Sequence, residues 1–347
     1  MTYKRLVTLM AVGAVTLAAA GGCLRRKETI TIKPDGAVTI ALAYEGESKE
    51  FETADALPSE ESGWAVTRTT KTEENGKETS TRSAERTFAA GEELPGSFAK
   101  KHDPDADLYL AFPTTIRKEK RADGVYLHFR RVYTPRPWAH VQFWQDQFFD
   151  DSVKKIGEKS PDEMTHDERV QLVKAFAGFE MFKQVELVRQ ALRECDADLK
   201  QDAWLHARAA LLKVGEDTDW GTFVDRVANL GAEERDKTFE EESKRIVQDS
   251  LDAFRRTLRT AADYGDGPME RFEAAFAKAK KRYEITSQIG GHGFEIRVHM
   301  PGEVVAHNAD KIDDDGAAEW EFDGSIFRDR PYELMITSKL PKDGDER

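Results

Sequence analysis

Histidines and carboxylates that lie close together could bind a metal ion or transfer protons near neutral pH. The densest such group in this chain comprises His292, Glu295, His299 and His307. In a strand that rises about 3.3 Å per residue, Glu295 and His299 would lie about 13 Å apart, too far to share one metal ion. None of the other histidines has the spacing of an HExxH zinc motif. We therefore predict no metal site and no cofactor.

An acidic run precedes Gly316 and could supply oxygen ligands for calcium, through Asp310, Asp313, Asp314 and Asp315. If Gly316 is aligned with the glycine of an EF-hand loop, Lys311 and Phe322 occupy the first and twelfth positions, where carboxylates are needed. We therefore interpret the run as a solvated turn.

Other motifs of catalysis are missing from the sequence. The segment Gly290–Gly293 lacks the Lys-Ser/Thr of a phosphate-binding loop, and we predict a bend between strands there. No Gly-x-Ser-x-Gly marks a serine nucleophile. Cys195 follows Leu187, Val188 and Leu192 on a helical stripe, which favours a buried thiol. We predict no catalytic residue, and an enzymatic role is the less favoured interpretation.

The amino terminus has the three zones of a secretory signal. Lys4 and Arg5 are followed by an uncharged apolar run over residues 6–20 and by small residues up to Gly22. The run is too short to span a bilayer comfortably, because a spanning helix needs about 20 apolar residues. We predict that residues 1–22 form a signal peptide, that the chain is exported, and that Cys23 is the first residue after cleavage.

The segment Ala20-Gly21-Gly22-Cys23 resembles the lipobox of bacterial lipoproteins, although that family usually has Leu at the position of Ala20. The resemblance implies that the Cys23 sulfur takes a diacylglycerol and that acyl chains such as palmitate fix the protein to a membrane on its extracytoplasmic, periplasmic face. Two or three chains would give stable attachment. In enterobacterial lipoproteins an Asp at the position of Leu24 marks inner-membrane retention, so the resemblance also implies the outer membrane.

Three basic residues follow the cysteine: Arg25, Arg26 and Lys27. Near an anionic leaflet each would gain about 1 kcal/mol, so one prediction places all three at the membrane surface. The alternative is that they form the solvated start of the first strand. The whole chain has a net charge of −13. This acidity excludes nucleic acid as a partner, because phosphate binding depends on excess Lys and Arg.

Alternating apolar residues predict that residues 23–136 are rich in strands. Val38, Ile40, Leu42 and Tyr44 would share one buried face. The Asn75-Gly76 pair predicts a hairpin between residues 64–73 and 77–88, polar on both faces and projecting into solvent, and a second hairpin is predicted over residues 114–133.

Between residues 137 and 283 the apolar period becomes helical, beginning with Trp138, Val141, Trp144 and Phe148. The pattern predicts a helical bundle, with a long helix that starts at the capping box Thr165–Glu168 and ends near Cys195. Further helices are predicted over residues 198–214, 218–230, 232–264 and 268–283.

The two-residue period returns over residues 284–340, and residues 341–347 are predicted to be a disordered tail. Neither group of strands is large enough to bury its own apolar face, because a lone small sheet is marginally stable. The fold predicted is therefore α+β: one mostly antiparallel sheet built from the N- and C-terminal segments, with a large inserted helical bundle.

The two ends of the chain also resemble bacterial lipoproteins of the LppM type. The resemblance covers about a third of the chain and depends on Cys23 followed by a strand, Pro34-Asp35-Gly36, Met300-Pro301-Gly302-Glu303-Val304-Val305, His307-Asn308-Ala309, Gly316 and Glu319-Trp320-Glu321-Phe322. It implies a β-rich domain around helices at the membrane, and lipid binding, which has been attributed to some of these proteins.

Three roles remain open from the sequence. The first is a membrane-anchored lipoprotein with a binding or scaffolding role toward a protein or lipid partner in the envelope. The second is a lipid or hydrophobic-ligand binder, with a cavity between the sheet face of Val38, Ile40 and Leu42 and the helices around Trp144 and Phe254. The third is an envelope hydrolase that uses carboxylates or histidines.

Overall fold

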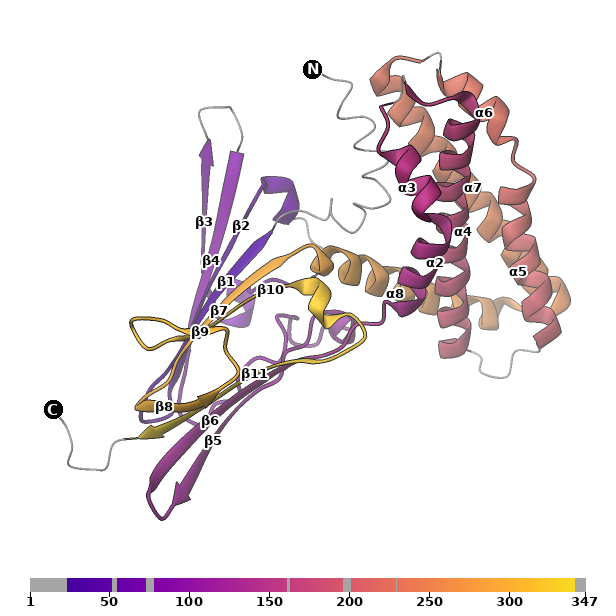
Figure 1. Ribbon diagram of the computed structural model, residues 1–347. Coiled ribbons are helices and arrows are strands. Elements are labelled where there is room, and N and C mark those ends of the chain that lie inside the picture. Colours follow the sequence, from indigo (N-terminus) through magenta and orange to yellow (C-terminus); the bar gives the residue numbers. More distant parts are fainter. Residues whose placement is uncertain are drawn as a thin grey trace. The chain divides into compact units, whose positions relative to one another are not determined.

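The computed structural model describes residues 24–51, 55–72, 78–160, 163–195, 201–228 and 230–340. These divide into two compact units (Figure 1): a β unit of residues 24–137 and 282–340, and a helical unit of residues 138–281. The predicted α+β class is confirmed. The predicted signal peptide, Cys23, the Asn75-Gly76 turn and the tail 341–347 lie outside the described residues.

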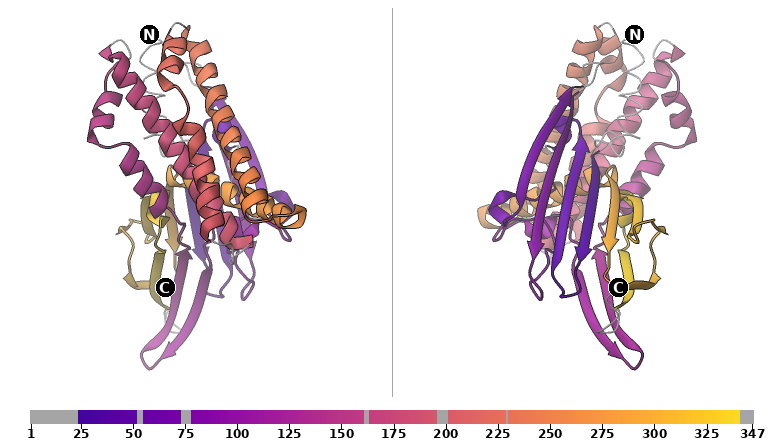
Figure 2. Two further views of the ribbon diagram at one scale, coloured as in Figure 1. Left: turned by 90° about the vertical axis from the view of Figure 1, so that its right-hand side faces the viewer. Right: turned by 90° about the vertical axis from the view of Figure 1, so that its left-hand side faces the viewer.

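The described strands of the β unit form two sheets. The first has seven strands in the order β3-β4-β2-β1-β7-β10-β9, and β1 to β4 run side by side in the right-hand view of Figure 2. The second has four strands in the order β5-β6-β11-β8. The bounds are β1 Arg25–Ile32, β2 Val38–Gly46, β3 Ala65–Thr72, β4 Glu78–Phe88, β5 Thr114–Arg121, β6 Gly124–Tyr133, β7 Gly293–His299, β8 Glu303–His307, β9 Lys311–Ile312, β10 Ala318–Asp323 and β11 Tyr332–Leu340.

Both sheets combine strands from the two ends of the chain, as predicted, and every pairing of strands except the parallel β1–β7 is antiparallel. The number of sheets was predicted wrongly, as one. The β5–β6 hairpin pairs with β11, not with the first four strands. This arrangement lets each sheet bury its apolar face against the other, so that Ile40 and Val298 of one sheet and Phe129 and Ile336 of the other belong to a single core.

The buried face of β2 is confirmed, since Val38, Ile40, Leu42 and Tyr44 are all buried. The polar β3–β4 hairpin is also confirmed. Nearly every residue of β3 is exposed, and β3 is an edge strand of its sheet. At the base of the hairpin, Phe88 and the adjoining Trp64 are buried with their rings 6.1 Å apart.

The helical unit contains most of the helices, and none in the described part of the chain is long and apolar enough to cross a membrane. The predicted start of the long helix is confirmed: the Thr165 backbone N–H donates to Glu168 (2.9 Å), and the Glu168 N–H donates to Thr165 Oγ1 (3.3 Å). The bounds are α2 Ala139–Phe148, α3 Asp151–Gly157, α4 His166–Cys195, α5 Gln201–Glu216, α6 Trp220–Ala228, α7 Ala232–Ala261 and α8 Asp266–Gly290.

Helix α8 ends at Gly290, whereas the sequence predicted that it would end near Tyr283. The extra turns continue the apolar stripe, because Ile285 and Ile289 are buried in the core of the β unit. The segment Gly290–Gly293 is therefore a helix-to-strand junction and not a bend between strands. A Cβ on Gly324 would overlap the Ile289 carbonyl, so this junction needs a glycine beside it.

Candidate functional site

The described part of the β unit starts at Leu24, the residue after Cys23. The Leu24 side chain is only 1% exposed, and its carbonyl oxygen accepts a hydrogen bond from the Gly293 backbone N–H (3.2 Å). Arg25 is already paired with Glu45 of β2 and Gly293 of β7. A group attached to Cys23 is therefore joined to the packed core by a single peptide link, with no flexible spacer between them.

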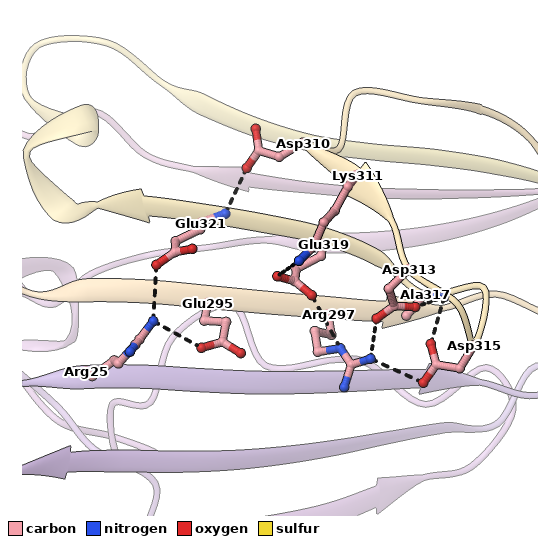
Figure 3. A network of polar contacts seen from close by, with 10 residues as sticks. All are labelled: Arg25, Glu295, Arg297, Asp310, Lys311, Asp313, Asp315, Ala317, Glu319 and Glu321. Carbon is pink, nitrogen blue, oxygen red and sulfur yellow. Dashed lines mark hydrogen bonds and ion pairs between the residues drawn. The ribbon is translucent and has the colours of Figure 1, made fainter.

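The three basic residues after Cys23 point to opposite faces of the sheet, because successive strand residues alternate. Arg25 lies on the outer face beside Glu321 (3.1 Å) and Glu295 (3.4 Å), as Figure 3 shows. Lys27 pairs with Glu45 (3.1 Å). Membrane contact by Arg25 and Lys27 stays a prediction.

Arg26 points into the core and is only 4% exposed. The prediction that Arg26 lies at the membrane surface is therefore wrong. Arg26 shares its face of β1 with Glu28, Ile30 and Ile32, all of which are buried. The register that buries the two isoleucines also buries the arginine.

Inside the β unit, Arg26, Glu28 and Arg131 form a buried ion triad. Arg26 Nη2 donates to Glu28 Oε2 (2.7 Å), and Arg131 Nη1 donates to Glu28 Oε1 (2.7 Å). Burial by itself raises the pKa of Glu28, but the two guanidinium groups more than offset this effect, and the pKa lies below its ordinary value. Glu28 is thus held as a carboxylate.

Aromatic rings surround the triad. The Arg26 guanidinium lies over Phe98 (4.8 Å) and Phe112 (4.9 Å), and that of Arg131 lies over the same Phe112 ring (5.1 Å). Such cation–π contacts partly replace the lost hydration. Because no substrate atom can reach a side chain enclosed in this way, the triad is a structural feature and not an acid–base site.

Two aspartates of the acidic run before Gly316 are paired with an arginine. Arg297 on β7 donates to Asp313 and to Asp315 (3.2 Å), as Figure 3 shows. Both carboxylates also accept from the Ala317 backbone N–H (2.9 and 3.2 Å). The pKa of Asp313 is lowered to about 2, first by hydrogen bonding with Asp315 and then by the nearby Arg297. In the described parts of the chain no three His, Cys, Asp or Glu residues are grouped so as to hold a metal ion.

The histidine group is dispersed. His299 lies on β7 and His307 on β8, which belong to different sheets. The Glu295 carboxylate is engaged by Arg25. His292 is buried, and its burial, followed by the nearby Arg26, lowers its pKa to about 4. His292 is therefore neutral at physiological pH.

Cys195 is the last residue of α4 and is half-buried, where the sequence favoured a fully buried thiol. Its Sγ lies 3.8 Å from the Leu192 carbonyl oxygen.

A polar groove lies beside the β3–β4 hairpin and was not foreseen from the sequence. It has a volume of about 340 Å³ and is lined by Ser59, Glu60, Glu61, Val66, Arg68 and Arg82. Arg68 and Arg82 lie directly opposite each other on adjacent strands. We refer to it as the hairpin groove.

An apolar groove lies within the helical unit. It has a volume of about 270 Å³ and is lined by Phe148, Lys174, Ala177, Gly178, Met181, Phe182, Leu212, Gly215, Glu216 and Trp220. Two glycines permit close packing around it, because a Cβ on Gly178 would overlap the Phe148 ring and one on Gly215 would crowd Met181. We refer to it as the bundle groove.

The sequence predicted a cavity beside the face of β2 that carries Val38, Ile40 and Leu42. Val38, Ile40 and Leu42 are packed in the core between the two sheets of the β unit. The apolar groove lies instead among α2, α4, α5 and α6.

Comparison with known proteins adds little to this geometry. No protein-family model matches the chain, and no curated protein matches it. Among solved structures, it is similar to the NMR structure of the folded domain of the Mycobacterium tuberculosis protein LppM. That match covers 94% of each chain at 10% sequence identity with a TM-score of 0.28. Similarity this remote supports no inference about activity.

Proposed function

We propose that this chain is a lipid-anchored bacterial envelope protein, held by acyl groups on Cys23 at the extracytoplasmic face of a membrane, with the outer membrane favoured. Its two units serve as binding or scaffolding modules for a partner in the envelope. The observation that carries the proposal is the leader, which has a basic end, an apolar run and small residues directly before Cys23.

The start of the fold supports this assignment. Leu24 is buried and the first described strand, β1, begins at Arg25, so the described strands all follow the predicted cleavage site. Cleavage before Cys23 would therefore keep every described strand in the mature chain.

The proposal predicts that the mature amino-terminal peptide begins at Cys23 and carries a thioether-linked diacylglycerol, which mass spectrometry of the membrane fraction would detect. Cys23→Ser should shift the protein from the membrane fraction to the soluble fraction by at least tenfold, because the acyl chains supply the attachment. Cys195→Ser is the matched control and should leave the distribution unchanged. An unmodified Cys23, or equal membrane retention of both variants, would contradict the proposal.

A second candidate function, binding of a hydrophobic ligand, is favoured by the bundle groove. Its lining is mostly aromatic and aliphatic, which is typical of sites for small apolar molecules. Lys174 and Glu216 are exposed at the groove and could fix the polar end of a ligand. No comparable observation favours a hydrolase, because Glu28 and His292, which have shifted pKa values, are buried and line neither groove.

Leu212→Lys tests this second candidate. Placing a charge in the bundle groove should weaken binding of an apolar fluorescent probe such as N-phenylnaphthylamine by at least tenfold, since a buried charge costs several kcal/mol. Leu205→Lys on the same helix is the matched control, because Leu205 is exposed and lies outside the groove. Fluorescence titration of both variants should show loss of affinity for Leu212→Lys alone; equal affinities would exclude the groove as the binding site.

A further inference from the structure

We propose that one end of the seven-stranded sheet is a membrane-contacting surface. This end carries Leu24. At this end, Arg68 and Arg82 of the β3–β4 hairpin contact the phosphates of the lipid headgroups. This inference deepens the proposed function and rests on it, since it takes Cys23 to be acylated. We refer to this surface as the anchor end.

The short connection to the anchor fixes which end of the sheet meets the bilayer. Adjacent Cα atoms are about 3.8 Å apart, so the Cys23 Cα lies about that distance from the Cα of the buried Leu24. Arg25 is already held between β2 and β7. A lipid on Cys23 therefore holds the anchor end at the membrane, and the β unit cannot move away from it on a tether.

The register of the sheet then places the hairpin at the same level. Arg26 lies opposite Tyr44, Tyr44 opposite Arg82, and Arg82 opposite Arg68, so these residues form one row across four strands. This row lies two residues from Leu24, which is about 7 Å along a strand. Beyond the row, β3 continues to Thr72 and remains paired with β4. The hairpin thus extends beyond the row toward the end of the sheet that carries Leu24.

The arginine pair in this row has the charge that a phosphate surface requires. Like charges directly opposite each other on adjacent strands are destabilising, yet in the described part of the chain neither Arg68 nor Arg82 forms an ion pair with a carboxylate. Arg82 donates to the Pro58 carbonyl oxygen, while its buried Nε has no acceptor among the described residues. Burial and the neighbouring Arg68 also lower the pKa of Arg82.

A phosphate oxygen between the two guanidinium groups would relieve this repulsion, because the planar forks of Arg match phosphate geometry. The hairpin groove beside the pair is also lined by Glu60 and by Glu61, and Glu61 is paired with Lys100 (2.6 Å). In a chain with a net charge of −13, an arginine pair that has no ion-pair partner among the described residues also favours an orientation of this end toward an anionic leaflet.

Electron paramagnetic resonance on the lipidated full chain tests the orientation. In a Cys195→Ser background, a nitroxide is attached at Thr70→Cys in the hairpin or at Lys33→Cys, which is exposed and adjoins the opposite end of β1. The Leu24 end of β1 and Lys33 are about 26 Å or more apart along the strand. Vesicles of phosphatidylglycerol and phosphatidylethanolamine carry a small fraction of a gadolinium-chelating lipid, which accelerates the relaxation of nearby nitroxides.

We expect the Thr70→Cys label to relax several-fold faster on these vesicles than in detergent, and the Lys33→Cys label to change little. Equal enhancement at the two sites would overturn the inference while leaving the anchor intact. If neither labelled protein is found on the vesicles, the anchor itself has failed and the inference fails with it.

The role of the arginine pair is tested in the Thr70→Cys protein by Arg68→Gln/Arg82→Gln. The matched control is Arg117→Gln/Arg121→Gln, which removes the same charge from β5 in the other sheet. We expect the first pair to reduce the relaxation enhancement at Thr70→Cys by at least half and the control pair to leave it unchanged. The unfolding midpoint of the first variant should be equal to or above that of the parent, because repulsion is removed. An unchanged enhancement in the first variant would overturn the assignment of this pair.

Discussion

Replacing Glu28 by glutamine is expected to lower the free energy of unfolding of the β unit by about 3–5 kcal/mol, the usual cost of removing one partner from a buried ion pair. The carboxylate is the shared acceptor of two buried guanidinium groups, each 2.7 Å from one of its oxygens. A neutral amide leaves two cations in a low-dielectric core with no counter-charge, and its NH₂ group would face one of the guanidinium groups.

Hydrogen exchange of the β1 amides measures this effect within the β unit, so that unfolding of the helical unit does not confuse the result. Glu321→Gln is the control, because it breaks an exposed ion pair with Arg25 on the same sheet and should cost less than about 1 kcal/mol. Similar losses in the two variants would refute the assignment of the triad as a tightly coupled unit.

A triple variant separates the ionic role of the triad from its packing role. Arg26→Met, Glu28→Met and Arg131→Met together remove the charges of the triad while keeping long side chains in the core. Buried ion triads can often be replaced by apolar residues without loss of stability. We expect the triple variant to be clearly more stable than Glu28→Gln alone.

Acidification between pH 6.5 and about 4 is expected to destabilise the β unit by about 3 kcal/mol through His292 alone. The pKa of His292 is lowered to about 4 in the folded chain, against an ordinary value of 6.5. The unfolded chain therefore binds a proton first as the pH falls, and each unit of pKa difference corresponds to about 1.4 kcal/mol. This stabilisation is fully present above pH 6.5 and is lost as the pH falls toward 4.

Several carboxylates contribute at lower pH and can be separated from His292. The pKa values of Glu119, Asp123 and Asp313 are lowered to about 2, so their effects on stability fall mainly below pH 4.5. His292→Gln should therefore flatten the dependence of β1 amide protection on pH between 6.5 and 4.5. His307→Gln, at an exposed residue, should retain the parent slope. An unaltered slope in His292→Gln would contradict the role of this histidine.

Local patterns in the sequence predict the elements that depend on local chemistry. The alternation of Val38, Ile40, Leu42 and Tyr44 identifies a buried strand face, and Thr165 with Glu168 marks the start of α4. The end of α8 is different. Ile285 and Ile289 extend the helix because they enter the core of the β unit, and this tertiary contact leaves no separate signal in the sequence.

The partition of strands into two sheets also depends on long-range pairing. Period two shows which side of a strand is buried but not which strand lies beside it. The pairing of β6 with β11 joins segments that are far apart in the chain. The sequence therefore identified the buried faces of the strands correctly. It predicted one sheet because it does not show which strands pair with each other.

The candidate sites were foreseen in part for the same reason. The inward orientation of Arg26 could have been found from the sequence, since it has the same parity as Ile30 and Ile32 on one strand. Its partner Arg131 could not, because it comes from the other sheet. A two-residue turn at Asn75-Gly76 would set Arg68 opposite Ser83, whereas the observed register pairs Arg68 with Arg82. The hairpin groove depends on this one-residue difference.

The parallel pairing of β1 with β7 has a consequence for how the protein matures. β1 is central in its sheet, yet its neighbour β7 follows the whole helical unit in the chain. A chain translocated from its amino end would deliver β1 first, with one edge unsatisfied until nearly all of the polypeptide has emerged. Unpaired strand edges attract other chains, while helices assemble quickly from local contacts. The helices are thus expected to form early and sheet closure to come last, and any truncation before β7 would leave an aggregation-prone edge.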